Sequence, residues 1–67
     1  MKKTLLEALQ KKYEANIAEA DATAKIYFEN SVGIGEHPTH IKELDKLIST
    51  IADNEGKIEI LKEFNDG

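Results

Sequence analysis

The residues whose types and spacing best suit chemistry are Glu36, His37, His40 and Glu43, near the middle of the chain. His40 and Glu43 are one turn apart on a helix, and an imidazole and a carboxylate at that spacing can share a zinc ion. The same residues are typical of a helix start, where Glu36 or His37 accepts free backbone amides and Pro38 takes the first helical position. We favour this second interpretation, which predicts neither a metal ion nor a cofactor.

No other motif indicates a reaction. The segment Gly33-Ile34-Gly35 follows a helical pattern rather than a strand, and it lacks the lysine and the hydroxyl of a phosphate-binding loop. No serine or threonine forms a recognisable triad with a histidine and an acid, and the chain contains no cysteine. The sequence therefore predicts a protein that is not an enzyme.

The length of 67 residues allows one small domain, near the lower size limit for a single hydrophobic core. Ordering such a chain costs on the order of 100 kcal/mol, at about 1.5 kcal/mol per residue, so apolar burial must be nearly complete. Two helices packed on each other leave one flank of each in water. We therefore expect residues 1–67 to form one domain that associates with itself or with a larger protein.

Apolar residues recur at helical spacing in two segments of nearly equal length. Their spacing of three or four residues averages to the seven-residue repeat of a coiled coil. Thr4 and Glu7 form a capping-box pattern at the start of the first segment. Between the segments, Gly33 can end a helix in the left-handed conformation, and Ile34 can make the apolar contact that follows such a cap. The sequence predicts an all-α antiparallel hairpin with helices at about 4–31 and 38–64, joined by residues 32–37. The predicted seam consists of Leu6, Leu9, Tyr13, Ile17, Ala20, Ala24 and Tyr27 in the first helix and Leu44, Leu47, Ile51, Asn54, Ile58 and Leu61 in the second.

A joint centred near Ile34 sets a register in which the numbers of facing residues add to about 70. This register brings Asn16 close to Asn54, a polar pair that would fix the alignment of the helices. It also places Tyr13 over Gly56, whose missing side chain would leave room for the ring. Gly56 should weaken the second helix without ending it, since the apolar phase resumes afterwards. Leu6 and Leu9 should face Ile58, Leu61 and Phe64.

Charge is unevenly distributed along the chain, whose net charge is -4. Residues 1–12 carry four lysines and one glutamate, whereas the remainder carries five lysines and twelve acids. We expect these charges to pair between the two helices. Binding of a polyanion is the alternative, although the chain has no arginine to form phosphate forks. The expected pairs join Lys2, Lys3, Lys11 and Lys12 to Glu55, Glu59, Glu63 and Asp66.

Two apolar features indicate a surface for association. Tyr27 and Phe28 are adjacent and cannot both enter one narrow seam, so one should lie on an exposed patch near the joint. The second helix is apolar over a wide arc through Ile41 and Ile48, wider than one partner helix needs. We expect a homodimer that forms a four-helix bundle, together with a second, different protein partner. The residues expected to bind partners are Tyr27, Phe28, Val32, Ile34, Ile41 and Ile48.

The run from Ile26 to Pro38, followed by Leu44-Asp45-Lys46-Leu47, resembles short uncharacterised proteins of marine tailed phages. The resemblance spans most of the chain and brings no catalytic residue. It implies expression in an infected bacterial cytoplasm, where small acidic proteins often bind host machinery. No apolar run is long enough to cross a bilayer, and the N-terminus lacks the apolar core of a signal peptide. We therefore expect a soluble, cytoplasmic protein.

In architecture alone the chain is also similar to the Rop family of plasmid copy-number proteins, helical hairpins that dimerise and bind paired RNA loops. A shared architecture does not by itself establish a function. The sequence therefore predicts a non-enzymatic protein-interaction module, and the phage resemblance implies an adaptor or modulator of a host protein. The alternative is an RNA-binding hairpin of Rop-like architecture, in which the lysines of the first helix contact RNA.

Overall fold

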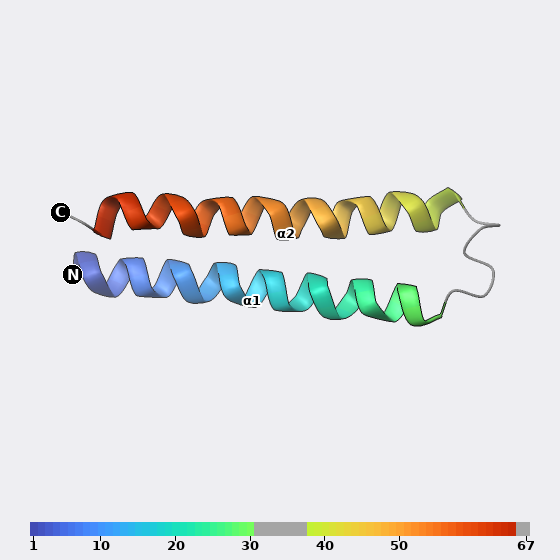
Figure 1. Ribbon diagram of the computed structural model, residues 1–67. Helices are drawn as coiled ribbons and strands as arrows, with labels where there is room; N and C mark the ends of the chain where they lie inside the picture. Colours follow the sequence, from blue (N-terminus) through green and yellow to red (C-terminus); the bar gives the residue numbers. More distant parts are fainter. Residues whose placement is uncertain (31–37, 66–67) are drawn as a thin grey trace.

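The protein folds as two antiparallel α-helices that lie side by side along their whole length (Figure 1). The computed structural model describes residues 1–30 and 38–65, and every element within these ranges is helical. Helix α1 spans Lys2–Glu29 and helix α2 spans Pro38–Asn65, with 28 residues each. Both termini lie at one end of the hairpin, which we call the open end, and the opposite end is the bend end. The predicted all-α hairpin is confirmed.

Helix α1 begins at Lys2, two residues before the predicted start near residue 4. Met1 is the N-cap without a side-chain hydrogen bond, and its carbonyl accepts the backbone N–H of Leu5 at 3.0 Å. Thr4 therefore lies inside the helix, and the predicted cap formed by Thr4 and Glu7 is wrong. The physical reason is that Lys2 and the lysine after it are good helix formers, so nothing stops the first turn from extending towards the N-terminus.

Helix α1 ends at Glu29, two residues before the predicted position. Asn30 adopts φ -102° and ψ 54°, which takes the backbone out of the helical region. The backbone N–H and the side-chain Nδ2 of Asn30 both donate to the carbonyl of Ile26 at 3.0 Å. The asparagine thus satisfies a carbonyl of the last turn while ending the helix.

Helix α2 begins at Pro38, as predicted from the preset φ of proline and its lack of an N–H group. It passes through Gly56 without interruption and ends at Asn65, so the prediction that Gly56 would not end the helix is confirmed. The predicted joint at 32–37, including the capping roles of Gly33 and Ile34, lies outside the described residues.

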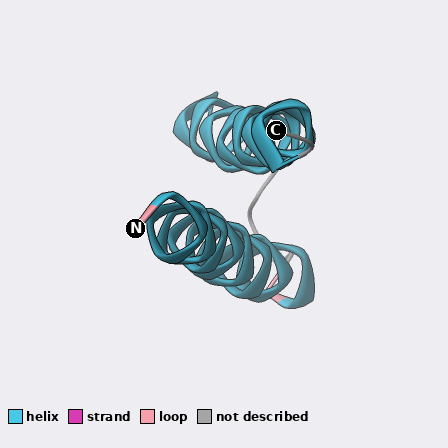
Figure 2. Cartoon of the chain, turned by 90° about the vertical axis from the view of Figure 1, so that its left-hand side faces the viewer, coloured by secondary structure: helices cyan, strands magenta, loops and turns pink. Residues whose placement is uncertain are grey.

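The core is a narrow line of small and polar side chains along the seam. In the described part of the chain only Ala20, Ala24 and Asn54 are buried, and no large side chain is fully enclosed. The two alanines let the helix backbones approach closely, because their side chains end at Cβ. In Figure 2 the helices cross at a shallow angle rather than running strictly parallel. The larger seam side chains are half-buried: Leu6, Tyr13, Ile17, Tyr27, Leu44, Leu47, Ile51, Ile58 and Leu61.

Two contacts across the seam fit the predicted register, and a third departs from it by three residues. Asn16 Nδ2 donates to Asn54 Oδ1 at 3.0 Å, and the ammonium of Lys57 lies 5.5 Å from the centre of the Tyr13 ring. The numbers in both pairs add to 70. Nearer the bend end, the rings of Tyr27 and His40 meet edge to face at 5.6 Å, and those numbers add to 67.

Two details of the predicted packing are wrong. A Cβ added to Gly56 would meet nothing within 4 Å, so this glycine does not make room for the Tyr13 ring. Leu9 and Phe64 are 38% and 57% exposed, so they flank the seam rather than filling it. The reason is that the seven-residue repeat through Ile17 reaches residue 10, which leaves residue 9 on the flank.

Candidate interaction surfaces

Three ion pairs form among residues 1–30 and 38–65, and each joins two residues of the same helix. They join Lys25 to Asp21 at 2.8 Å, Lys46 to Glu43 at 3.7 Å and Lys62 to Glu59 at 2.6 Å. An oppositely charged side chain three or four residues away on the same helix is nearer to a lysine than a carboxylate on the other helix is. The expected pairing between helices is therefore wrong for Lys2, Lys3, Lys11 and Lys12 with Glu55, Glu59 and Glu63, and Asp66 lies outside the described residues.

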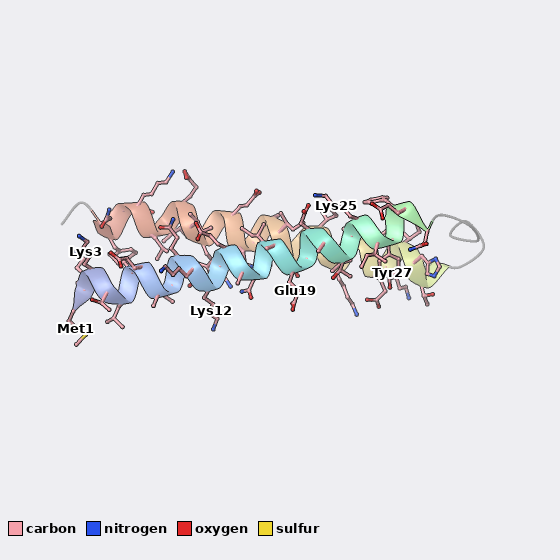
Figure 3. The ribbon with its side chains drawn as sticks, turned by 90° about the horizontal axis from the view of Figure 1, so that it is seen from below. Met1, Lys3, Lys12, Glu19, Lys25 and Tyr27 are labelled. Carbon is pink, nitrogen blue, oxygen red and sulfur yellow. The ribbon has the colours of Figure 1, made fainter. Side chains whose placement is uncertain are left out.

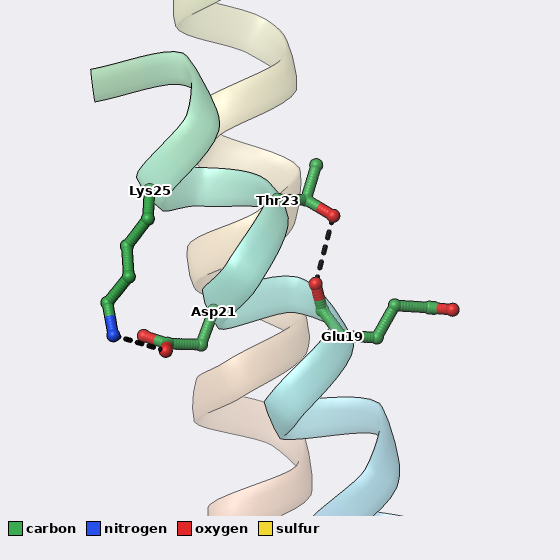
Figure 4. Close-up of polar contacts among 4 residues, drawn as sticks. All are labelled: Glu19, Asp21, Thr23 and Lys25. Carbon is green, nitrogen blue, oxygen red and sulfur yellow. Dashed lines mark hydrogen bonds and ion pairs between the residues drawn. The ribbon is translucent and has the colours of Figure 1, made fainter. Parts of the chain in front are cut away.

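The Asp21–Lys25 pair has the favourable order, with the acid four residues before the base, and both side chains lie along the outside of α1 (Figure 4). The hydrogen bond to Asp21, reinforced by the negative charge of that carboxylate, raises the pKa of Lys25 above its ordinary value of 10.5. The pair is solvent-exposed, so its role is local support of α1 rather than chemistry.

The residues that could have shared a zinc ion have other neighbours. His40 packs edge to face against Tyr27, and the Glu43 carboxylate lies 3.7 Å from the ammonium of Lys46. Across the two described ranges, no group of three histidine, cysteine or acidic side chains is placed to hold a metal ion. Glu36 and His37 lie outside those ranges.

A hollow at the open end lies between the two helices. Leu6 and Glu7 of α1 and Leu61 and Lys62 of α2 line it in part, and its volume is about 170 Å³. Ligand pockets that enclose a drug-sized molecule are typically about 300–1,000 Å³. This hollow is therefore too small to serve as such a pocket.

A group of exposed apolar side chains lies near the bend end; we call Phe28, Ile41 and Ile48 the bend patch. Their exposed fractions are 60%, 62% and 51%. The prediction that only one of the two adjacent aromatics enters the seam is confirmed, since Tyr27 is half-buried against His40 while Phe28 is exposed.

The members of the bend patch share one broad face of the hairpin. Phe28 and Ile41 each follow one member of the Tyr27–His40 contact by one residue. Antiparallel helices are related by a twofold rotation about an axis perpendicular to their common plane, so equivalent flanking positions fall on the same face. Ile48 is seven residues after Ile41 and therefore lies on that face two turns further along α2. Of the other expected binding residues, Val32 and Ile34 lie outside the described residues.

A second apolar group, which sequence reasoning missed, lies at the open end on the opposite broad face. Lys57 contacts Tyr13 from one flank of α2. Phe64 follows Lys57 by seven residues and therefore lies on the same flank, two turns nearer the open end and beside Leu6. We call this group the end patch. In the sequence this group is visible as two pairs of apolar residues, each four residues apart and beside the predicted seam. Its members, all exposed, are Leu5, Leu9, Ile60 and Phe64.

Within the described residues, no helix is both long enough and apolar enough to span a bilayer. No protein-family model, no curated protein and no solved structure matches this chain. The function is therefore inferred from the exposed surfaces of the hairpin.

Proposed function

We propose that this protein is a non-enzymatic protein–protein interaction module that presents the bend patch to another protein. The observation that carries the proposal is the exposure of Phe28, Ile41 and Ile48 on one face, each more than half accessible to solvent. Apolar side chains that include an aromatic ring, gathered on one face, are typical of the centre of protein interfaces. Singly exposed apolar residues are ordinary, but three gathered on one face favour a binding surface.

The border of the bend patch is charged. Asp21 precedes Phe28 by seven residues and lies on the same flank of α1, where Lys25 pairs with it. A polar rim around an apolar centre is typical of interfaces that form and separate reversibly. This arrangement supports a module that meets its partner transiently.

The proposal includes self-association as a four-helix homodimer. The radius of gyration, 15.5 Å, exceeds the roughly 11 Å expected for a compact chain of this length. Two helices packed only on each other leave most of their outer surface in water, and a second copy would cover part of it.

The RNA-binding alternative receives less support. Lys2, Lys3, Lys11 and Lys12 occupy four different positions of the seven-residue repeat, so they point in four directions around α1. A phosphate backbone is contacted best by cations that line one face. The absence of arginine also removes the side chain best suited to phosphate forks.

Capture from a bacterial lysate tests the proposal, because the phage resemblance implies a bacterial partner. The tagged wild-type chain should retain one stoichiometric protein, and the triple substitution of Phe28, Ile41 and Ile48 by serine should abolish its retention. The matched control replaces Ile60 and Phe64 by serine, which removes exposed apolar surface on the other face and should leave capture intact. Equal loss in both variants would contradict the assignment of the bend patch.

The same preparations distinguish the RNA alternative. An RNA ligand should be retained at low salt and released steeply as the salt concentration rises, since binding releases counterions from the phosphates. A protein held by the bend patch should remain bound over that range, because burial of apolar surface is insensitive to salt screening. Retention of RNA with a steep salt dependence would overturn the proposal in favour of the alternative.

A further inference from the structure

Helix α1 carries a second regular stripe on the side away from the seam, which we call the outer stripe: Leu5, Lys12, Glu19 and Ile26. These residues are seven apart, so they lie along one face of the helix. Figure 3 looks onto α1 from below and shows Lys12 and Glu19 projecting from the same edge of the helix, whereas Lys25 projects from the other edge. Leu5 and Ile26 are 56% and 58% exposed.

The two charges of the outer stripe have no ionic partner among the described residues. The residues three and four positions away from Lys12 and from Glu19 are all uncharged, so neither side chain has an ion pair along its own helix. In Figure 4 the Glu19 carboxylate extends away from α1, and the Thr23 hydroxyl donates to the Glu19 backbone carbonyl at 2.9 Å rather than to the carboxylate. The Asp21–Lys25 pair is on the opposite edge.

The order of residues along the outer stripe is self-complementary. It reads apolar, cation, anion, apolar, so a second α1 laid antiparallel about the point between residues 15 and 16 would face it with the matching order. Leu5 would then meet Ile26 of the other copy, and Lys12 would meet its Glu19. A parallel copy would instead place Lys12 against Lys12. Alternating with the stripe are Ala8, Ala15 and Ala22, also seven apart and exposed, whose small side chains would let the two helices approach.

The chain exposes more surface than a compact folded monomer of its mass. The chain exposes 5292 Å², whereas a folded monomer of 7.5 kDa exposes about 4,200 Å². The excess, about 1,000 Å², is close to the roughly 800 Å² that each partner buries in an interface of standard size. The exposed surface is therefore enough for an interface of standard size, and the residue order of the outer stripe is the one that a second copy of α1 complements.

From these observations we infer that a second copy of this chain docks antiparallel on the outer stripe of α1, with Lys12 of each copy paired to Glu19 of the other. The inference rests on the homodimer proposed above and specifies its interface. The two copies of α1 lie at the centre of the four helices, and the bend ends point in opposite directions. Since Phe28, Ile41 and Ile48 face another side, the bend patch remains available to a different protein.

Charge reversal at the outer stripe tests this arrangement. Lys12→Glu and Glu19→Lys should each weaken the homodimer roughly ten-fold, because two symmetric pairs change from attraction to repulsion. An equimolar mixture of the two single variants should restore association. In that heterodimer the two substituted positions face each other with opposite charges, and the unchanged Glu19 of one chain faces the unchanged Lys12 of the other. Sedimentation equilibrium of the full-length chains measures both effects, and circular dichroism reports whether each variant stays helical.

Matched controls exclude a general effect of net charge. Lys42→Glu and Glu63→Lys make the same charge changes at exposed positions of α2 and should leave the dimer constant within about two-fold. If the outer-stripe variants dimerise as the wild type does, or if mixing them restores nothing, the inference is wrong. A wild-type chain that is monomeric at all concentrations would overturn the inference and the dimer, while capture through the bend patch would still be decided by its own variants.

A cysteine at the twofold axis tests the antiparallel alignment independently. The chain has no cysteine of its own, so Ala15→Cys introduces a single thiol. Residue 15 lies beside the twofold axis and so close to residue 15 of the other copy, and mild oxidation should convert most of the protein into a disulfide-linked dimer. Ala22→Cys, exposed on the same face but seven residues from the axis, is the matched control and should remain mostly uncrosslinked, because it would lie near residue 8 of the other copy. Equal cross-linking at the two positions would overturn the arrangement.

Discussion

Asn16 and Asn54 form the only side-chain hydrogen bond between the two helices in the described part of the structure. Asn16 Nδ2 donates to Asn54 Oδ1 at 3.0 Å, and Asn54 Nδ2 in turn donates to the Thr50 carbonyl at 2.7 Å. Asn54 is only 5% exposed, so its amide depends on these two partners rather than on water. The pair therefore stabilises one alignment of the helices relative to its alternatives, as a polar core residue does in coiled coils.

We expect Asn16→Ala to lower the free energy of unfolding by about 1–3 kcal/mol, because it leaves the buried Asn54 oxygen without its donor. Replacing both asparagines by leucine should recover that loss while relaxing the register. Urea unfolding of Asn16→Leu, Asn54→Leu and the double leucine variant gives the coupling energy. Cross-linking of cysteines at 17 and 51, compared with a pair shifted by one turn, reports the register. A coupling near zero, or an unchanged register in the double leucine variant, would show that the pair does not select the alignment.

Gly56 weakens α2 without serving a packing role, so it is a site at which the protein can be stabilised. A Cβ there meets nothing within 4 Å, and the residue lies inside a continuous helix. Gly56→Ala should raise the free energy of unfolding by about 1 kcal/mol, which for a chain of this size corresponds to roughly 4–8 °C in the melting temperature. Ala18→Gly, at an exposed position of α1, should lower the melting temperature by a similar amount. Destabilisation by Gly56→Ala would indicate that the glycine is needed by a contact in the assembly.

The sequence predicts well those features that depend on local spacing. Both helices, the start of α2 at Pro38 and the Asn16–Asn54 pair follow from helical periodicity and from breakers gathered between 31 and 38. It fails where a small rotation of a helix about its own axis decides the outcome. A spacing of three or four residues fits both Leu9 and residue 10, and the structure leaves Leu9 on the flank.

Ion pairs and exposed patches were harder to predict for a related reason. Long charged side chains choose among several partners of similar energy, and Lys62 pairs with Glu59 on its own helix rather than with the other helix. The bend patch was only partly accessible to sequence reasoning. Adjacency and helical spacing placed Tyr27 in the seam and Phe28 outside it, but the expected binding residues still included Tyr27, which is half-buried.

The close approach of the helices depends on Ala24, which is 5% exposed and lies in the seam. Ala24→Leu should lower the free energy of unfolding by about 1–3 kcal/mol, because the added carbons force the backbones apart or push side chains off their rotamers. Thermal unfolding measures the loss. Ala18→Leu makes the same change at an exposed position and should have little effect, since leucine is also a good helix former. If both variants melt at the same temperature as the wild type, the seam at this position is looser than described.

The Asp21–Lys25 ion pair predicts how stability depends on pH in the alkaline range. Because the pKa of Lys25 is raised in the folded state, the pair stabilises the fold fully below the unfolded value of 10.5, and this contribution is lost as the pH rises through the folded value. Lys25→Gln should therefore melt at a lower temperature than the wild type at pH 8, and the difference should shrink above pH 10.5. Lys42→Gln removes a lysine that takes part in none of the three ion pairs and should show no such pH-dependent difference. A gap between wild type and Lys25→Gln that stayed constant up to the alkaline limit would mean that the lost packing of the lysine stem, rather than its charge, accounts for the change.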